Sequence, residues 1–383
     1  MSGGAGSYEV AVAGTGLHAF GRFEGTSVTD LGAAAVRAAL LDAELAHSGF
    51  DAAFCASVYS GVAAAHKVLG SLGMTGMPIY TVEAGCASGG AALSLAVESI
   101  RSGRHDTVLV FGMEKMSAGI IRSSFFEPWR EEAGLAATPA YFALRARRLM
   151  ETSNVTREHL AEVSVKNHDN GVRNPDAMYR EAVTREQVLA STMVCDPLTL
   201  FMLCSPNEGA AALVLRRASG AGGEIRLTAA EVRSHLPGSV LGEATPLAGL
   251  VDDSIPAPTT LAADAAYEAA GVGPGDLDVV ECQDTDSARE LLSYEELRLC
   301  PPGEAAAWID ARHTHLGGPL PVNPSGGLLS KGEPLGASAL GQVVELTLQL
   351  RGAAGPRQVD GARVALGHTV GRGANAGVTI LTR

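Results

Sequence analysis

The feature that most constrains the fold of this 383-residue chain is an internal repeat of one glycine-rich segment. Shifting residues 85–98 (GCASGGAALSLAVE) by 247 positions places them on residues 332–345 (GEPLGASALGQVVE), and six of the fourteen positions are identical. Each copy leads into a helix-forming stretch and then an apolar strand, TVLVFG after the first and RVALG after the second. This duplication predicts two similar halves that face each other, which would bring two helix N-termini together.

Strand and helix patterns alternate through both halves of the chain. Apolar runs typical of buried strands are followed by Ala-rich or amphipathic stretches typical of helices, so the pattern predicts a layered α/β fold. We expect strands at residues 9–14, 52–59, 79–82, 107–112, 210–216 and 277–282, and helices at residues 28–41, 62–72, 89–101, 259–270 and 287–297.

Residues 113–191 differ from the rest of the chain in composition, because they are rich in charged and aromatic side chains. They show helical patterns at 138–152 and 157–170. We interpret them as an inserted helical segment. On a chain of net charge −13, its basic residues either bind phosphate groups or form a solvated helix face. The same net charge argues against a general nucleic-acid-binding surface. The basic residues are Arg145, Arg147, Arg148, Lys166, Arg173, Arg180 and Arg185.

Cys86 lies where the first copy of the repeat turns from strand into helix. The free N–H groups and the positive dipole end of a helix N-terminus favour thiolate over thiol. The glycines at 85, 89 and 90 allow a substrate carbonyl to come close. A buried core cysteine is the alternative, but strand, sharp turn, small residues and helix coincide here as they do around other nucleophiles.

The remaining motifs argue against other chemistries. The other five cysteines show no paired metal spacing, and His313 and His315 have no third ligand at usable spacing, so we expect no metal and place them in a surface loop. GTGLHAFG after the first strand has the wrong spacing for a dinucleotide fingerprint. No apolar run approaches a membrane span and the N-terminus lacks a signal h-region, so we expect a cytoplasmic protein.

Five ordered segments resemble the thiolase superfamily, in particular its lipid-transfer (sterol-carrier-protein-type) and archaeal-type branch. They are EAGCASGGAAL, DPLTLFMLCSPNEGAAALVL, ECQDTDSARELLSYEELRL, NPSGGLLSKGEPLGASALGQVVEL and ALGHTVGRGANAGVTIL. The resemblance implies a duplicated fold in five layers, α-β-α-β-α, with an inserted loop domain for coenzyme A, and a homodimer. We expect an N-terminal half at 1–112 and 192–220, the loop domain at 113–191, and a C-terminal half at 221–383.

The resemblance also implies roles for single residues. Cys86 matches the family's acyl-accepting cysteine, and the acyl oxyanion would rest on its own N–H and on that of Gly371. Arg145, Arg148 and Lys166 are the candidates for the coenzyme A site. The substrate would be an acyl thioester of coenzyme A or of an acyl carrier protein, and no tightly bound cofactor is implied.

Three positions depart from the family's pattern. Glu333 replaces the histidine of Gly-His-Pro, Gln283 begins QDTD where this branch carries His-Asp-Cys-Phe, and Thr369 holds the position of a second catalytic cysteine. Glu333 suits a general base, although its charge would oppose thiolate formation at Cys86. Gln283 either donates to a substrate oxygen or caps a strand end. His368 either replaces the missing acid or base or is a structural histidine.

These departures decide the functional expectation. Condensation of two acyl thioesters needs donors for a second oxyanion, and losing one such donor commonly costs about a hundredfold. We therefore expect an acyltransferase that passes the acyl group from Cys86 to a hydroxyl or amine. The alternatives are carbon–carbon bond formation or cleavage, with a small OB-fold or zinc-ribbon partner, and a non-catalytic subunit.

Overall fold

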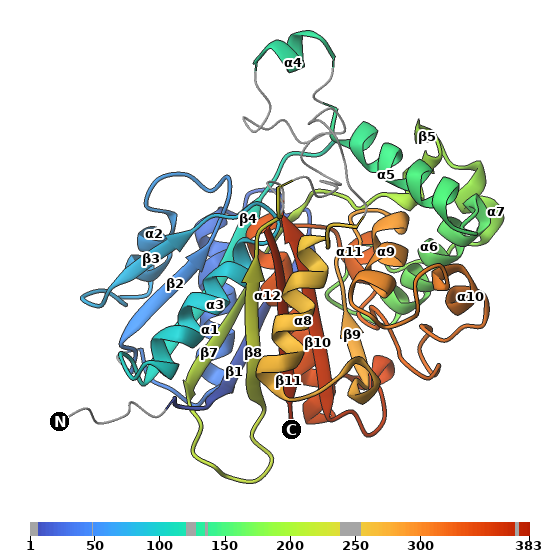
Figure 1. Ribbon diagram of the computed structural model, residues 1–383. Coiled ribbons are helices and arrows are strands. Elements are labelled where there is room, and N and C mark those ends of the chain that lie inside the picture. Colours follow the sequence, from blue (N-terminus) through green and yellow to red (C-terminus); the bar gives the residue numbers. More distant parts are fainter. Residues whose placement is uncertain (1–6, 48, 120–127, 135–136, 238–253, 372–374) are drawn as a thin grey trace.

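The structure is a computed structural model that describes residues 7–47, 49–119, 128–134, 137–237, 254–371 and 375–383. Its strands form two similar sets with helices between and around them (Figure 1).

The first set of strands lies in the order β3-β2-β4-β7-β1. β1 and β4 run antiparallel to β7, whereas β2 runs parallel to both β4 and β3. The strands are β1 (Val10–Gly21), β2 (Ala52–Ala56), β3 (Ile79–Val82), β4 (Thr107–Lys115) and β7 (Glu208–Arg217).

The second set repeats this pairing pattern in the order β8-β11-β10-β9. β8 and β10 run antiparallel to β11, β9 runs parallel to β10, and a parallel bridge from Val280 to Val322 stands where β2 and β3 pair in the first set. β1 and β8 join the sets through the pair Ala11 and Arg226. The internal repeat therefore reflects a duplicated fold. The strands are β8 (Arg226–Arg233), β9 (Val279–Glu281), β10 (Val364–Gly371) and β11 (Asn375–Thr382).

Helices form three layers around the two sets of strands. The repeat helices α3 and α12 lie between the sets and contact strands of both, α1 packs on β1 and β7, and α8 packs on β8 and β11. This arrangement confirms the expected five layers, α-β-α-β-α (Figure 1). The helices of these layers are α1 (Val28–Asp42), α2 (Ala64–Ser71), α3 (Ser88–Arg101), α8 (Pro258–Ala270), α9 (Ser287–Glu296) and α12 (Leu335–Arg351).

Glycines set the spacing between these layers. A Cβ at Gly14 would lie 2.4 Å from Ala39 O, and a Cβ at Gly16 would lie 2.1 Å from Ala35 O. The GTG sequence in β1 therefore allows α1 to pack closely on the strand. Between the two sets, a Cβ at Gly89 would lie 2.9 Å from Ala339 Cβ, so α3 and α12 also pack closely. The glycines that imitate a nucleotide motif are therefore packing residues.

The segment between β4 and β7 contributes helices and a short hairpin beside the second half (Figure 1). α5 packs on α9, and α6 packs on α9 and α11. Leu149, Leu160, Leu291 and Val378 belong to one apolar cluster, so α5 and α6 share a core with the second half. The division into 113–191 and its flanking halves stays a proposal. The elements are α4 (Pro128–Glu132), α5 (Thr138–Thr152), α6 (Arg157–Val172), α7 (Arg185–Ala190), β5 (Met193–Cys195) and β6 (Leu198–Thr199).

Several short elements complete the fold. α10 (Ala305–Asp310) packs on α6 and α9, and α11 (Gly327–Lys331) lies directly before Glu333. The described part of the chain also has the 3-10 turns η1 (Leu200–Met202), η2 (Pro274–Asp276) and η3 (Gly355–Arg357).

Candidate active site

Cys86 lies in a tight turn between β3 and α3. Gly85 has a φ of +59°, a left-handed conformation that favours glycine. Ser88 Oγ accepts from Ala84 N at 2.8 Å and donates to Gly85 O at 2.6 Å. The turn holds the partly exposed Cys86 directly before Ala87, the N-cap of α3, at the positive end of the helix dipole.

Gly371, at the end of β10, packs directly on this turn. A Cβ at Gly371 would lie 2.1 Å from Ala84 O and 2.8 Å from Ala87 N, so no other residue fits. The structure therefore places the backbone of Gly371 beside the turn that carries Cys86. The next residues, 372–374, lie outside the described part of the chain.

Glu333 lies between α11 and α12 and is only 3% exposed. Its N–H donates to Ser205 O at 2.9 Å. Its carboxylate accepts from Gln283 Nε2 at 2.8 Å through Oε1 and from Cys204 Sγ at 3.3 Å through Oε2. Burial and the nearby Glu333 carboxylate raise the pKa of the Cys204 thiol well above its usual value. Cys204 is therefore a protonated donor to Glu333.

Gln283 and Thr369 connect Glu333 to the turn that carries Cys86. Thr369 Oγ1 lies 3.0 Å from Gln283 Oε1 and 3.0 Å from the backbone oxygen of Cys86. A Cβ at Gly90 would lie 3.0 Å from Thr369 Cγ2, so this glycine of α3 leaves room for the threonine. Cys86, Thr369, Gln283 and Glu333 thus form one connected cluster from four separate segments.

His368 lies outside this cluster. It is fully buried on the opposite face of β10 from Thr369, as expected for neighbours in a strand. Gln283 N donates to its Nδ1 at 3.4 Å, and its Nε2 lies 3.1 Å from Thr259 Oγ1. Burial holds its pKa well below the usual value, so the ring is neutral. Its placement favours the structural alternative: His368 orients the backbone of Gln283.

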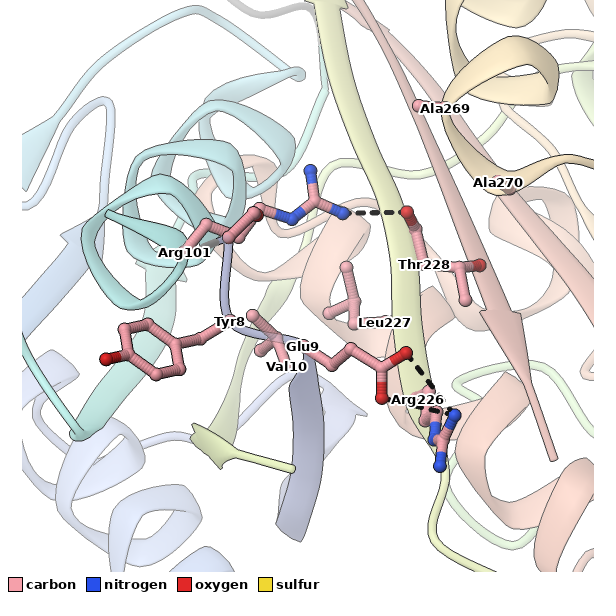
Figure 2. Close-up of a pocket in the computed structure, with 10 residues that line it drawn as sticks. Tyr8, Glu9, Val10, Arg101, Arg226, Leu227, Thr228, Ala269 and Ala270 are labelled. Carbon is pink, nitrogen blue, oxygen red and sulfur yellow. Dashed lines mark hydrogen bonds and ion pairs between the residues drawn. The ribbon is translucent and has the colours of Figure 1, made fainter. Parts of the chain in front are cut away.

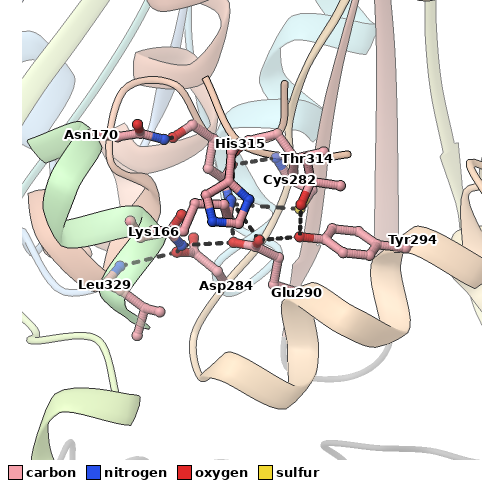
Figure 3. Close-up of polar contacts among 12 residues, drawn as sticks. Lys166, Asn170, Cys282, Asp284, Glu290, Tyr294, Thr314, His315 and Leu329 are labelled. Atoms are coloured by element: carbon pink, nitrogen blue, oxygen red, sulfur yellow. Dashed lines mark hydrogen bonds and ion pairs between the residues drawn. The ribbon is translucent and has the colours of Figure 1, made fainter. Parts of the chain in front are cut away.

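The basic residues expected to bind coenzyme A are mostly engaged inside the protein. Arg145 is 7% exposed and pairs with Asp286. Lys166 is 1% exposed, with Nζ 2.7 Å from Glu290 Oε1 and 2.6 Å from Val322 O (Figure 3). Their charges are neutralised within the core, which argues against phosphate binding by these two residues. Arg148 is half-buried on α5.

The buried network around Lys166 supports the segment that carries Glu333 (Figure 3). Asp284 accepts from Leu328 N at 2.6 Å and Leu329 N at 3.2 Å, at the start of α11, and from Asn167 Nδ2 at 2.8 Å. Burial, together with the nearby Glu290, raises the pKa of Asp284 well above its usual value. α11 is thereby tied to α6 immediately before the chain reaches Glu333.

Sequence reasoning missed Cys204 as a site residue and treated Thr369 only as an absent cysteine. The residue pattern treats Cys204 as a core thiol, and the signal that could have found it is its place inside one of the family-like segments, DPLTLFMLCSPNEGAAALVL. Asn207, from the same segment, donates to Lys331 O at 2.8 Å and packs on Gly332, whose φ of +85° turns the chain into Glu333.

The HTH sequence lies among turns, as expected, but His313 is half-buried and His315 is buried. His315 is 6% exposed, and its Nε2 lies 3.5 Å from Glu162 Oε1. Among the described residues, no three His, Cys, Asp or Glu side chains are grouped closely enough to hold a metal ion. None of the described helices is long and apolar enough to cross a bilayer.

A separate cavity of about 400 Å³ opens at the other end of α3 (Figure 2). Arg101 donates to Thr228 O at 2.7 Å, and Arg226 pairs with Glu9 at 3.2 Å. Both guanidinium groups that line the cavity are therefore engaged within the protein. The residues that the structure shows lining it include no cysteine or histidine.

A duplicated five-layer fold with a cysteine at the N-terminus of a central helix defines the thiolase class of enzyme. Residues 10–219 match the family model "Thiolase, N-terminal domain" and residues 250–383 match "Thiolase C-terminal domain-like". The chain belongs to the thiolase family, and its relatives place it in the branch of sterol carrier protein 2 and the archaeal acetyltransferases.

Three similar proteins show how far the likeness extends. Acetyl-CoA acetyltransferase of Methanothermobacter thermautotrophicus is 37% identical over 98% of this chain and 100% of its own. Human sterol carrier protein 2 is 36% identical over 97% of this chain and 71% of its own. The solved Ltp2-ChsH2(DUF35) aldolase has a TM-score of 0.85 at 22% identity, over 98% of this chain and 97% of that one, and shows the fold alone.

Proposed function

We propose that this thiolase-family enzyme is an acyltransferase that carries the acyl group on Cys86 and passes it to a hydroxyl or amine. The observation that carries the proposal is the buried Glu333 carboxylate, which the Gln283 amide and the Cys204 thiol hold in one orientation near the nucleophile turn. A carboxylate held in this way can accept a proton. That suits deprotonation of an incoming acceptor.

The reaction divides into two transfers. The Cys86 thiolate attacks the carbonyl of an acyl thioester, the oxyanion rests on the N–H groups of Cys86 and Gly371, and the carrier thiolate leaves with the acyl group bound to Cys86. The acceptor then attacks the same carbonyl while Glu333 takes its proton. Collapse of the second tetrahedral intermediate releases the ester or amide and regenerates the Cys86 thiolate. The proposal includes a reducing, cytoplasmic setting, because Cys86 must stay a free thiol.

Condensation of two thioesters is less well supported by these side chains. That reaction needs hydrogen-bond donors aimed at the enolate oxygen of a second thioester. At the three departing positions the side chains are Glu333, Gln283 and Thr369, and the amide N–H of Gln283 is directed at Glu333. A carboxylate beside a developing enolate would destabilise it.

Carbon–carbon bond formation or cleavage is the second candidate. It is favoured by the full-length likeness to an archaeal acetyl-CoA acetyltransferase. It is also favoured by the protonated Cys204 thiol, which donates to Glu333 beside the Gln283 amide. A small protein partner belongs to this candidate, because the similar fold of the Ltp2-ChsH2(DUF35) aldolase was solved as a complex.

We also propose that the chain forms a homodimer through the edge of its sheet at β3. β3 is the last strand in the order, and Tyr80 is 39% exposed on it. Leu95 of the neighbouring α3 is 52% exposed. An edge strand with exposed apolar side chains is a template for pairing with a second copy.

For coenzyme A we propose the inserted segment, with Arg148 as the remaining one of the three basic candidates. Lys166 and Arg145 are buried in the core, whereas the Arg148 side chain on α5 is only half-buried and therefore reaches solvent. An acyl carrier protein would deliver the same acyl group as a thioester of its own, and the assay below distinguishes the two carriers.

Intact-mass measurement tests the proposal directly. The protein is incubated with a panel of acyl-coenzyme A and acyl-carrier thioesters, and we expect an acyl adduct that is absent in Cys86→Ala. Glu333→Gln should still be acylated but should transfer the acyl group about 100-fold or more slowly. A β-ketoacyl product on adding acetyl-coenzyme A would favour the second candidate, and the absence of any adduct would refute the acyl-enzyme.

A further inference from the structure

Glu333, Gln283 and Thr369 form a line of polar contacts that ends on the backbone of Cys86. The three contacts are Gln283 Nε2 to Glu333 Oε1 at 2.8 Å, Gln283 Oε1 to Thr369 Oγ1 at 3.0 Å, and Thr369 Oγ1 to Cys86 O at 3.0 Å. Gln283 and Glu333 are 1% and 3% exposed and Thr369 is 3% exposed, so water does not easily replace these partners.

With Glu333 ionised, this line lacks one hydrogen. Gln283 Nε2 donates to the carboxylate, which leaves Gln283 Oε1 and Cys86 O both as acceptors facing the Thr369 hydroxyl. A hydroxyl carries one hydrogen, so Thr369 donates fully to only one of these two oxygens at a time.

With Glu333 protonated, the same atoms form a complete line. If the Gln283 amide turns over and exchanges Oε1 with Nε2, the carboxyl O–H of Glu333 donates to the amide oxygen. The amide N–H then donates to Thr369 Oγ1, and the threonine hydroxyl donates to Cys86 O. Each contact now joins one donor to one acceptor.

We propose that Gln283 and Thr369 are positioning residues that couple the proton on Glu333 to the turn that carries Cys86. When Glu333 takes the proton of the acceptor, the Gln283 amide reverses and the Thr369 hydroxyl is directed to the carbonyl of Cys86. The turn is then held as the Cys86 thiolate leaves. The inference takes Glu333 as the proton acceptor of the proposed function.

Other titratable groups near Glu333 do not break this line. Cys204 donates to the second oxygen, Oε2, in both arrangements. Asp284 faces the amides of α11, and the neutral His368 accepts from the backbone N–H of Gln283 rather than from its side chain. Cys86 joins this line through its backbone oxygen.

Removing the Thr369 hydroxyl should therefore destabilise the protonated state of Glu333 more than the ionised state. Thr369→Val keeps the shape of the side chain, removes one hydrogen bond from the ionised arrangement and removes two from the protonated one. The loss of one additional hydrogen bond should lower the titration midpoint of Glu333 by about half to one pH unit. Thr369→Ser retains the hydroxyl and is the matched control.

Infrared difference spectroscopy measures this midpoint without any substrate. The carbonyl band of the protonated carboxyl group is followed against pH in the wild type, Thr369→Val and Thr369→Ser, each against the same protein carrying Glu333→Gln. We expect a lower midpoint in the valine variant only. Equal midpoints in the wild type and the valine variant, a higher one in valine, or equal shifts in valine and serine would overturn the relay.

Neutron diffraction from wild-type crystals below and above that midpoint gives a second test that needs no variant at position 369. The Gln283 amide should be reversed between the two, and one orientation at both pH values would refute the proposal. If Cys86 also forms an acyl-enzyme, the rise of its transfer rate with pH should move by the same amount in Thr369→Val. Failure to form an adduct would refute the proposed function while leaving both physical measurements interpretable.

Discussion

Lys166→Met should destabilise the protein strongly without weakening its binding of thioesters. Lys166 is 1% exposed, and its ammonium group lies 2.7 Å from Glu290 Oε1 and 2.6 Å from Val322 O (Figure 3). Methionine fills similar space without the charge. The variant therefore removes one partner of a buried ion pair that joins α6 to α9.

The size of the effect follows from what remains around Glu290. Breaking a buried pair by removing one partner typically costs about 3–5 kcal/mol, because the other charge is left buried. The Glu290 carboxylate keeps three donors, Tyr294 OH at 2.5 Å and the amides of Asn167 and Asn323 at 2.7 Å each. We therefore expect a loss near the lower end, about 3 kcal/mol in the free energy of unfolding.

Urea denaturation at fixed protein concentration measures this loss, and thioester kinetics measures binding. Lys67→Met, at an exposed lysine of α2, is the control and should change the free energy of unfolding by less than about 0.5 kcal/mol. If Lys166→Met behaved like this control and instead raised KM for coenzyme A thioesters, the reasoning from burial would be wrong. Lys166 would then be the phosphate ligand that its sequence context suggests.

Two further predictions concern packing and pH. Gly112→Ala would place a Cβ 2.0 Å from Gly336 O, so α12 must shift and the free energy of unfolding should fall by about 3 kcal/mol. Gly70→Ala, in open space on α2, should instead stabilise the protein by up to about 1 kcal/mol. Calorimetry of both variants measures the two changes. Contact with His315, whose Nε2 lies 3.5 Å from Glu162 Oε1, is the largest cause that lowers the pKa of Glu162 to about 2. The contribution of Glu162 to stability is therefore present above pH 4.5 and is lost as pH falls toward 2. Glu162→Gln should flatten the fall of the unfolding free energy in that window, and an unchanged slope would contradict the assignment.

Local patterns were sufficient for most of the fold. The expected helix at residues 138–152 coincides with α5, and the strand at residues 79–82 coincides with β3. β8 was not predicted: only Leu227, Ala229 and Ala230 are buried along its eight residues, and its polar positions obscure the alternation. The repeat and the family-like segments identified the duplication, because they compare distant parts of the chain and do not depend on local propensity.

Side-chain partners were harder to predict than elements. A basic residue in a helical sequence shows its charge but not its burial, and the partners of Arg145 and Lys166 are more than a hundred residues away. Cys204 reaches Glu333 across 129 positions for the same reason. Sequence periodicity can predict which face of a helix is buried, but it does not identify which distant carboxylate meets that face.

The departures at 283, 333 and 369 are better understood as one set than as three separate losses. A carboxylate that is 3% exposed needs donors, and Gln283 supplies an amide N–H. The Thr369 hydroxyl in turn lies within hydrogen-bonding distance of the oxygen of that amide. A site drifting without selection would accumulate unpartnered buried polar atoms, because nothing would match each change to the next. Here the side chains of Glu333, Gln283 and Thr369 are matched to one another, which favours an altered enzyme over a silent subunit.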